Sequence, residues 1–131
     1  MDAVKLHPVL LIIDDDPLIT ELFQKYMTRY GFDVLTANCG AKGLARVQSE
    51  GEEPISLVLT DMSMPDMDGL EVARSLYALR PGLPVLIATG HDTEQLRLTV
   101  PTNVNTVIRK PYKNSVALEL IRGILGLTPE P

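Results

Sequence analysis

Five short apolar runs alternate along the chain with longer stretches in which apolar residues recur every three or four positions. Apolar runs of this length, bounded by Gly, Pro or Asp, are typical of strands that are buried on both faces. The spacing of three and four is that of one face of an amphipathic α-helix. The pattern predicts strands over residues 9–13, 34–37, 55–59, 85–88 and 106–108, of which the second and fifth have the weaker signals.

Helix boundaries are marked by capping residues. Asp16 is a natural N-cap, and Pro17 follows it at the first helical position, where a missing N–H costs nothing. Asp68 should cap a later helix in the same way. Only a short helix is expected over 94–99, because Pro101 follows it at once. The longer helices are predicted over residues 18–30, 41–50, 70–79 and 115–125.

Strands that alternate with helices predict an α/β fold, a doubly wound parallel sheet of five strands with helices on both faces. Such a sheet binds its ligand at the carboxyl ends of its strands. We expect one domain over residues 8–127, an N-terminal extension over 1–7 and a disordered tail over 128–131, which reads Thr-Pro-Glu-Pro.

The residues that follow the predicted strands are chemically distinct. Carboxylates follow the first and third strands, a hydroxyl follows the fourth and an ammonium follows the fifth: Asp14, Asp15, Asp16, Asp61, Thr89 and Lys110. Carboxylates that meet at one edge of a sheet repel each other, and such hard oxygen ligands suit Mg²⁺. A metal, an ammonium and a hydroxyl together can stabilise a phosphoryl group, with a carboxylate as the nucleophile.

Composition and charge exclude several classes of function. The 131 residues carry 17 acidic and 12 basic side chains, a formal net charge of −5, whereas nucleic-acid binding needs clustered positive charge. The single cysteine, Cys39, excludes a disulfide framework within one chain and suits a reducing compartment. No apolar run approaches the roughly 20 residues of a membrane span, so we expect a cytoplasmic protein without a membrane partner.

Several motifs resemble the receiver domain of two-component response regulators. They are IIDDDP over 12–17, LVLTDMSMPDMDGLE over 57–71, Thr89-Gly90, and RKPY over 109–112. The segment 57–71 is the most specific of them, and the similarity covers nearly the whole chain. The resemblance implies the flavodoxin-like strand order 2-1-3-4-5 and a domain that takes a phosphoryl group from a partner histidine and signals by changing conformation.

The resemblance also implies the metal and the phosphorylation site. Asp61 would be the phosphoacceptor. Asp14 and Asp15 would form the acidic pair that holds Mg²⁺, with Asp15 the more direct ligand. Asp61 and the backbone carbonyl of Ser63 would complete the protein ligands.

Thr89 and Lys110 would act on the phosphoryl group itself. Thr89 would bond a phosphoryl oxygen after phosphorylation, and Lys110 would contact Asp61 at rest and the phosphoryl group afterwards. The Lys110–Pro111 bond is usually cis in such domains. A receiver is a signalling phosphoacceptor that assists its own Mg²⁺-dependent phosphotransfer and dephosphorylation, and its partners are a sensor histidine kinase or a histidine phosphotransfer protein and a downstream protein.

Three features depart from the family pattern. Val107 stands where receivers commonly carry an aromatic switch residue, and Gly90 stands where they commonly carry Ala. The segment 91–105 is a poor match, and we expect the largest backbone change on activation there, with Val107 nearly still. The residues around Thr89 and Lys110 also resemble receivers attached to hybrid histidine kinases, so the chain is either such a domain or a free-standing regulator.

Two other classes of protein share parts of this pattern. Phosphatases of the haloacid dehalogenase type carry an Asp-x-Asp after their first strand, a later Thr and a late Lys, and would use Asp14 as the nucleophile. They need a cap for the substrate, and they leave the segment around Asp61 unexplained. A flavin- or nucleotide-binding domain is disfavoured because the chain has no Gly-rich phosphate loop.

Overall fold

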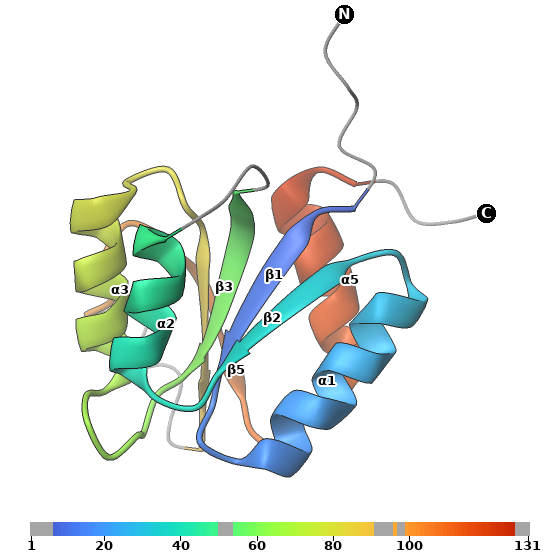
Figure 1. The fold of residues 1–131 in the computed structure, drawn as a ribbon, viewed down its shortest axis with the longest axis horizontal. Helices are drawn as coiled ribbons and strands as arrows, with labels where there is room; N and C mark the ends of the chain where they lie inside the picture. The colour runs from blue at the N-terminus through green and yellow to red at the C-terminus, as the bar shows by residue number, and fades with distance from the viewer. Residues whose placement is uncertain (1–6, 50–53, 91–95, 97–98, 128–131) are drawn as a thin grey trace, which may run out of the picture.

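Five parallel strands form the central sheet of the computed structural model, which describes residues 7–49, 54–90, 96 and 99–127. They lie in the order β2-β1-β3-β4-β5 (Figure 1), which confirms the predicted doubly wound α/β fold. The first strand therefore lies inside the sheet, and β2 and β5 form its edges. The strands are β1 (Val9–Ile13), β2 (Asp33–Ala37), β3 (Ile55–Asp61), β4 (Val85–Thr89) and β5 (Val104–Arg109).

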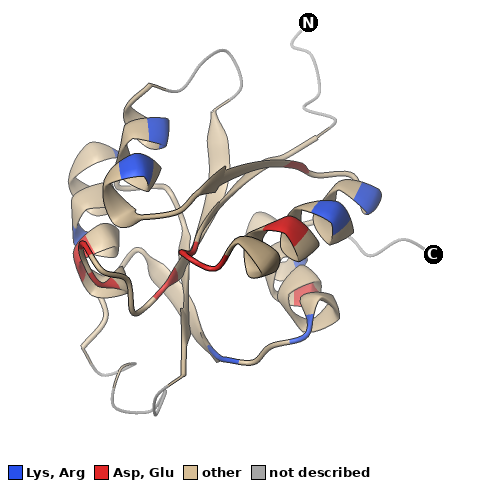
Figure 2. Ribbon diagram, turned by 60° about the horizontal axis from the view of Figure 1, so that its bottom comes forward, with Lys and Arg blue, Asp and Glu red and all other residues tan. Residues whose placement is uncertain are grey.

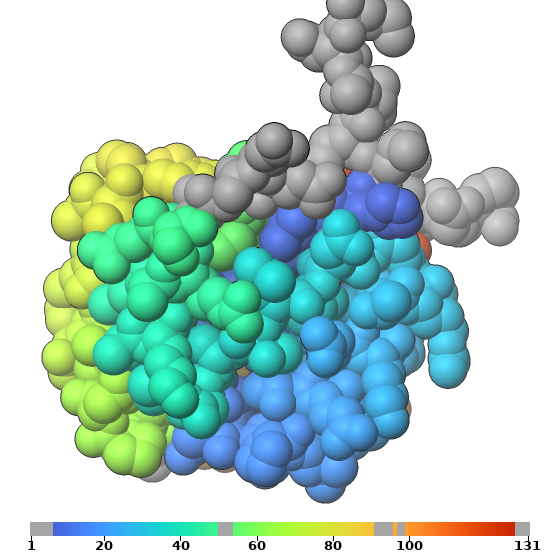
Figure 3. All heavy atoms as spheres, in the orientation of Figure 1, coloured from blue at the N-terminus to red at the C-terminus, as the bar shows by residue number. Residues whose placement is uncertain are grey.

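Helices cover both faces of the sheet. Two of them, α1 and α5, pack on one face, and α2 and α3 pack on the other (Figure 1). The edge strand β2 lies between α1 and α2 on the surface of the molecule (Figure 3). The helices are α1 (Pro17–Arg29), α2 (Gly40–Gln48), α3 (Gly69–Leu79) and α5 (Asn114–Leu125).

The strand β1 shows why continuous apolar runs predicted the sheet. Leu10 and Ile12 pack in the core beneath α1 and α5, whereas Leu11 and Ile13 pack in the core beneath α2 and α3. All four side chains are buried. Because side chains alternate along a strand, a strand that is covered on both faces must be apolar at every position.

The strands run further than their apolar residues. Thr60 and Asp61 are buried and continue β3, paired with Ile87 and Ala88 of β4. Backbone pairing extends a strand through polar residues, so the apolar pattern alone ended this strand too early. The helix expected over 94–99 lies largely outside the described residues, as do the expected extension and tail apart from His7.

Both predicted N-caps are confirmed. The Asp16 carboxylate accepts a hydrogen bond from the Leu18 N–H at 2.9 Å, and the Asp68 carboxylate accepts one from the Glu71 N–H at 2.8 Å. Each capping side chain satisfies a backbone donor that has no partner within its helix. Among the described residues, none of the helices has the length and apolar character that crossing a membrane requires.

Candidate functional site

The sequence-predicted residues meet at the carboxyl edge of the sheet. Thr89 is paired with Arg109 across β4 and β5, and its carbonyl accepts a hydrogen bond from the Lys110 N–H at 2.7 Å. Asp61 is paired with Ala88 at the end of β3. Acidic residues gather where the strands end (Figure 2). The parallel register thus places groups that are far apart in sequence at one edge.

Lys110 joins the two buried carboxylates. Its Nζ lies 3.1 Å from Asp14 Oδ2 and 3.2 Å from Asp61 Oδ1. The other oxygen of Asp14 accepts a hydrogen bond from the Asp16 N–H at 2.9 Å. Asp14 is only 3% exposed and Asp61 only 7% exposed, so the ammonium supplies the counter-charge that these carboxylates require. The expected contact of Lys110 with Asp61 is present.

Electrostatics at this edge favour additional positive charge. Burial and the neighbouring Asp14 charge raise the pKa of Asp61, while Lys110 and a backbone hydrogen bond from Ser63 oppose that rise. Burial lowers the pKa of Lys110, but the hydrogen bonds and charges of Asp14 and Asp61 outweigh it and leave the pKa raised. One ammonium therefore compensates two carboxylates only in part.

Three carboxylates form a cluster with the chemistry of a divalent metal site. Asp14, Asp15 and Asp61 can each offer an oxygen within 4.8 Å of the others. Asp15 is exposed, whereas the other two are buried, so the cluster opens to solvent on one side. Hard carboxylate oxygens beside open space fit Mg²⁺, which binds through one or two carboxylates and keeps several waters.

The loop after β3 folds back tightly onto the site. The Gly69 N–H donates to the Met62 carbonyl at 2.8 Å and closes the loop. A Cβ on Gly69 would lie 2.9 Å from the Asp61 carbonyl oxygen and 3.0 Å from Met62 Cα. Only glycine permits this approach of α3 to the end of β3, so Gly69 fixes how the loop that contains Ser63 leaves β3 after Asp61.

Thr89 and Val107 are buried, whereas the position of Gly90 is open. Thr89 is buried at the end of β4, and a Cβ built on the next residue, Gly90, meets nothing within 4 Å. Val107 is 2% exposed and belongs to the core beneath α2 and α3. The Lys110–Pro111 peptide bond is cis, as the resemblance implied.

Sequence reasoning missed two residues at the site. Tyr112 follows the cis peptide and is half-buried, and burial together with the charges of Asp14 and Asp61 raises its pKa, so the phenol stays protonated. Asp66 lies in the loop before α3, yet its carboxylate accepts hydrogen bonds from the first turn of α2. Tyr112 was visible only as part of a motif, and nothing in the sequence pairs Asp66 with α2.

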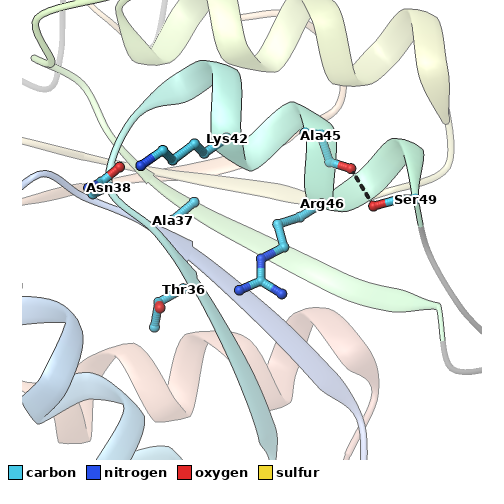
Figure 4. Close-up of a pocket in the computed structure, with 7 residues that line it drawn as sticks. All are labelled: Thr36, Ala37, Asn38, Lys42, Ala45, Arg46 and Ser49. Atoms are coloured by element: carbon cyan, nitrogen blue, oxygen red, sulfur yellow. Dashed lines mark hydrogen bonds between the residues drawn. The ribbon is translucent and has the colours of Figure 1, made fainter.

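Two hollows border the end of β2. One lies beside the acidic cluster and is lined by Asp14, Asp15, Pro17, Thr20, Thr36, Ala37 and Asn38. The other lies between β2 and α2 (Figure 4) and is lined by Thr36, Ala37, Asn38, Lys42, Ala45, Arg46 and Ser49. Because they share Thr36, Ala37 and Asn38, the basic side chains of α2 adjoin the outer edge of the acidic site.

Comparison with known proteins identifies the family. The model of the response regulator receiver domain matches residues 10–122. The transcriptional regulatory protein GlrR of Escherichia coli K12 is 40% identical over 84 residues, which cover 64% of this chain and 18% of that protein. The response regulator MprA of Mycobacterium leprae is 32% identical over 120 residues, which cover 91% of this chain and 51% of that protein. The matched residues thus span from 18% to 51% of the length of these relatives.

Solved structures share the fold. A CheY-like receiver domain protein from Methanospirillum hungatei JF-1 is 29% identical with a TM-score of 0.83, covering 92% of this chain and 94% of that one. The response regulator TrrA of Thermotoga maritima, solved in complex with Mg²⁺ and BeF, is 23% identical with a TM-score of 0.78, covering 89% and 98%. The chain belongs to the response regulator receiver domain family, and it is a phosphoacceptor domain of two-component signalling.

Proposed function

We propose that Asp61 accepts the phosphoryl group and that Asp14, Asp15, Asp61 and the Ser63 carbonyl hold Mg²⁺. The observation that carries the proposal is the buried pair of Asp14 and Asp61, bridged by one ammonium and open toward Asp15. Of the carboxylates in this cluster, Asp61 is the one that the close-packed loop after β3 presents at the strand end.

The proposed reaction is transfer from a phosphohistidine of a partner protein. An oxygen of Asp61 attacks the phosphorus, a P–O bond forms, the P–N bond breaks, and the electron pair returns to the imidazole nitrogen. Bound Mg²⁺ would supply positive charge against the phosphoryl oxygens. Lys110 would leave its resting hydrogen bond with Asp61 for a phosphoryl oxygen, and the Thr89 hydroxyl would donate to another. Hydrolysis of the acyl phosphate by water would restore Asp61, assisted by the same groups.

An apolar rim beside the site supports a protein partner. Leu18 and Leu22 of α1 are 61% and 50% exposed, and Val116 of α5 is 46% exposed. Leu22 also lines a hollow with Tyr112 and Lys110. A sensor kinase or histidine phosphotransfer protein that docks on this rim could present its histidine to Asp61.

The partners we propose are proteins, because the net charge of −5 disfavours nucleic acid. The proposed location is the cytoplasm, which suits the lone Cys39.

The phosphatase alternative leaves the surroundings of Asp61 without a role. Asp14 and Asp61 are both buried and both accept a hydrogen bond from Lys110, so these contacts do not single out Asp14 as the nucleophile. Asp61 has its own strand end and its own backbone hydrogen bond from Ser63, which a phosphatase mechanism leaves without a role.

Phosphorylation by a small acyl phosphate tests the proposal. The wild-type protein should be labelled with Mg²⁺ and not with EDTA, and Asp61→Asn should abolish labelling. Asp15→Asn should leave the fold intact and shift the Mg²⁺ requirement to higher concentration, whereas Asp33→Asn on exposed β2 serves as the control. Labelling of Asp61→Asn at the wild-type rate would contradict the proposal.

A further inference from the structure

Asp66 connects the loop after the phosphoacceptor to a different helix. Its Oδ1 accepts a hydrogen bond from the Gly40 N–H at 3.1 Å, and its Oδ2 accepts one from the Ala41 N–H at 2.9 Å. Gly40 and Ala41 are the first residues of α2, 26 and 25 positions away from Asp66 in sequence. The carboxylate of Asp66 thus bridges the loop after β3 and the start of α2.

The helix α2 depends on this outside partner. Its N-cap residue, Cys39, makes no side-chain hydrogen bond to the helix, and its first turn contains no acidic residue. The first N–H groups of a helix need acceptors, and a negative charge there is favourable. Asp66 supplies both. The hydrogen bond from the Ala41 N–H, with a further contribution from Gly40, lowers the pKa of Asp66 against the opposing effect of desolvation.

Packing reinforces the same connection. A Cβ built on Gly40 would lie 2.3 Å from Met67 Cγ and 3.1 Å from a Val72 methyl group. The start of α2 is therefore seated on the loop residue that follows Asp66, and Met67 in turn packs against the core beneath α2 and α3. The helices α2 and α3 also lie side by side (Figure 1).

The other end of this loop belongs to the phosphorylation site. Ser63, three positions before Asp66, donates a backbone hydrogen bond that acts on the Asp61 carboxylate. The bond between Gly69 and Met62 and the cap of α3 by Asp68 hold the two ends of the loop. Between those ends, the hydrogen bonds of the Asp66 side chain tie the loop to α2.

We propose that Asp66 is a positioning residue that clamps the phosphoacceptor loop onto α2, so that metal binding at the site and the conformation of the first turn of α2 are coupled. The inference rests on the proposed role of the Ser63 carbonyl as a ligand. With the clamp formed, the loop is held in one conformation and Ser63 is held beside Asp61. Coupling between two sites is reciprocal, so Mg²⁺ binding must act on Gly40 and Ala41 as strongly as the clamp acts on Mg²⁺.

Titration of Mg²⁺ into the full chain, followed by residue-resolved amide shifts, tests the clamp. In the wild-type protein the Gly40 and Ala41 amides should shift with the same midpoint as the amide of Ser63. In Asp66→Ala these shifts should disappear from α2, and the affinity for Mg²⁺ should fall about tenfold, the lower end of the usual effect of removing a residue that orients a ligand. Asp66→Asn, which keeps an acceptor oxygen, should be intermediate.

A matched control separates positioning from stability. Gly126 caps α5 with φ of 70°, and α5 packs on the opposite face of the sheet from α2 and α3. Gly126→Ala should therefore destabilise the chain without touching the clamp. Gly126→Ala should bind Mg²⁺ like the wild type and keep the α2 shifts. Equal Mg²⁺ affinity of Asp66→Ala and Gly126→Ala would overturn the clamp. If Asp15→Asn binds Mg²⁺ as tightly as the wild type, the proposed function is overturned, and the clamp with it.

Discussion

At the scale of single residues, charge decides what the site can do. Asp14 and Asp61 are buried at one strand edge, and the ammonium of Lys110 lies within hydrogen-bonding distance of both. Such an arrangement is held together by opposite charge but retains an excess of negative charge that a cation can neutralise. Function and stability are therefore opposed at Asp61.

Replacing Asp61 by Asn should stabilise the metal-free protein at neutral pH. The folded-state pKa of Asp61 is raised above its ordinary value of 3.8, mainly by burial and then by Asp14, so ionising it costs folding free energy as the pH rises. Asn does not ionise. The free energy of unfolding is measured in urea with EDTA. The advantage of Asp61→Asn should grow from about pH 3.5 to about pH 7, because this range begins near the ordinary pKa of a carboxyl group and extends above it. A constant difference across that range would contradict the charge argument.

Replacing Lys110 by Met should make the stability depend on Mg²⁺. The two carboxylates then lose their counter-charge, which should cost about 1–3 kcal/mol, below the full cost for a buried pair because the lysine is partly exposed. Added Mg²⁺ should restore much of this loss and raise the midpoint of thermal unfolding more than in the wild type. The backbone should stay folded, while phosphorylation is impaired. A variant that is unfolded with or without Mg²⁺ would show that Lys110 has a structural role instead.

At the scale of elements, a close approach between α3 and the end of β3 sets the position of Asp61, the proposed phosphoacceptor. The cap by Asp68 could be predicted from the sequence, because capping is a local rule. The contact of Gly69 with the Asp61 carbonyl could not, because it depends on how the loop returns in space. The link from Asp66 to α2 was out of reach for the same reason.

Two glycine substitutions should have opposite effects. Gly69→Ala places a Cβ 2.9 Å from the Asp61 carbonyl oxygen, a backbone atom that cannot yield without moving the strand end, so we expect a loss of about 1–3 kcal/mol and slower phosphorylation. Gly123→Ala lies inside α5, where a Cβ meets nothing within 4 Å, and should add about 0.5–1 kcal/mol. Urea unfolding measures both, and a neutral Gly69→Ala would disprove the tight approach.

At the scale of the whole molecule, the order of the strands brings distant residues together. The apolar runs of β1, β3 and β4 were clear in the sequence because these strands are buried on both faces. The edge strand β2 gave a weaker signal, since Asp33 is exposed and only part of the strand is buried. Convergence of Asp14, Asp61 and Lys110 followed from the topology, but the bridging geometry of the ammonium did not.

Activation should leave Val107 nearly unchanged. Its side chain is buried in the core beneath α2 and α3, and a β-branched side chain has few rotamers to adopt. We therefore expect the largest backbone response over 91–105, a segment that lies partly outside the described residues. Residue-resolved amide shifts of the free and the beryllofluoride-loaded protein measure this. Shifts confined to the neighbours of Asp61 would contradict the prediction.

Mapping the phosphorylated residue tests the central claim most directly. The full chain is incubated with Mg²⁺ and a small acyl phosphate as the phosphoryl donor. The aspartyl phosphate formed on the protein is trapped by reduction, and the modified residue is located by peptide sequencing in a mass spectrometer. The arrangement of Asp14, Asp61 and Lys110 predicts modification of Asp61 alone, and none when EDTA replaces Mg²⁺. Modification of Asp14, or of Asp61 without any divalent metal, would contradict the account.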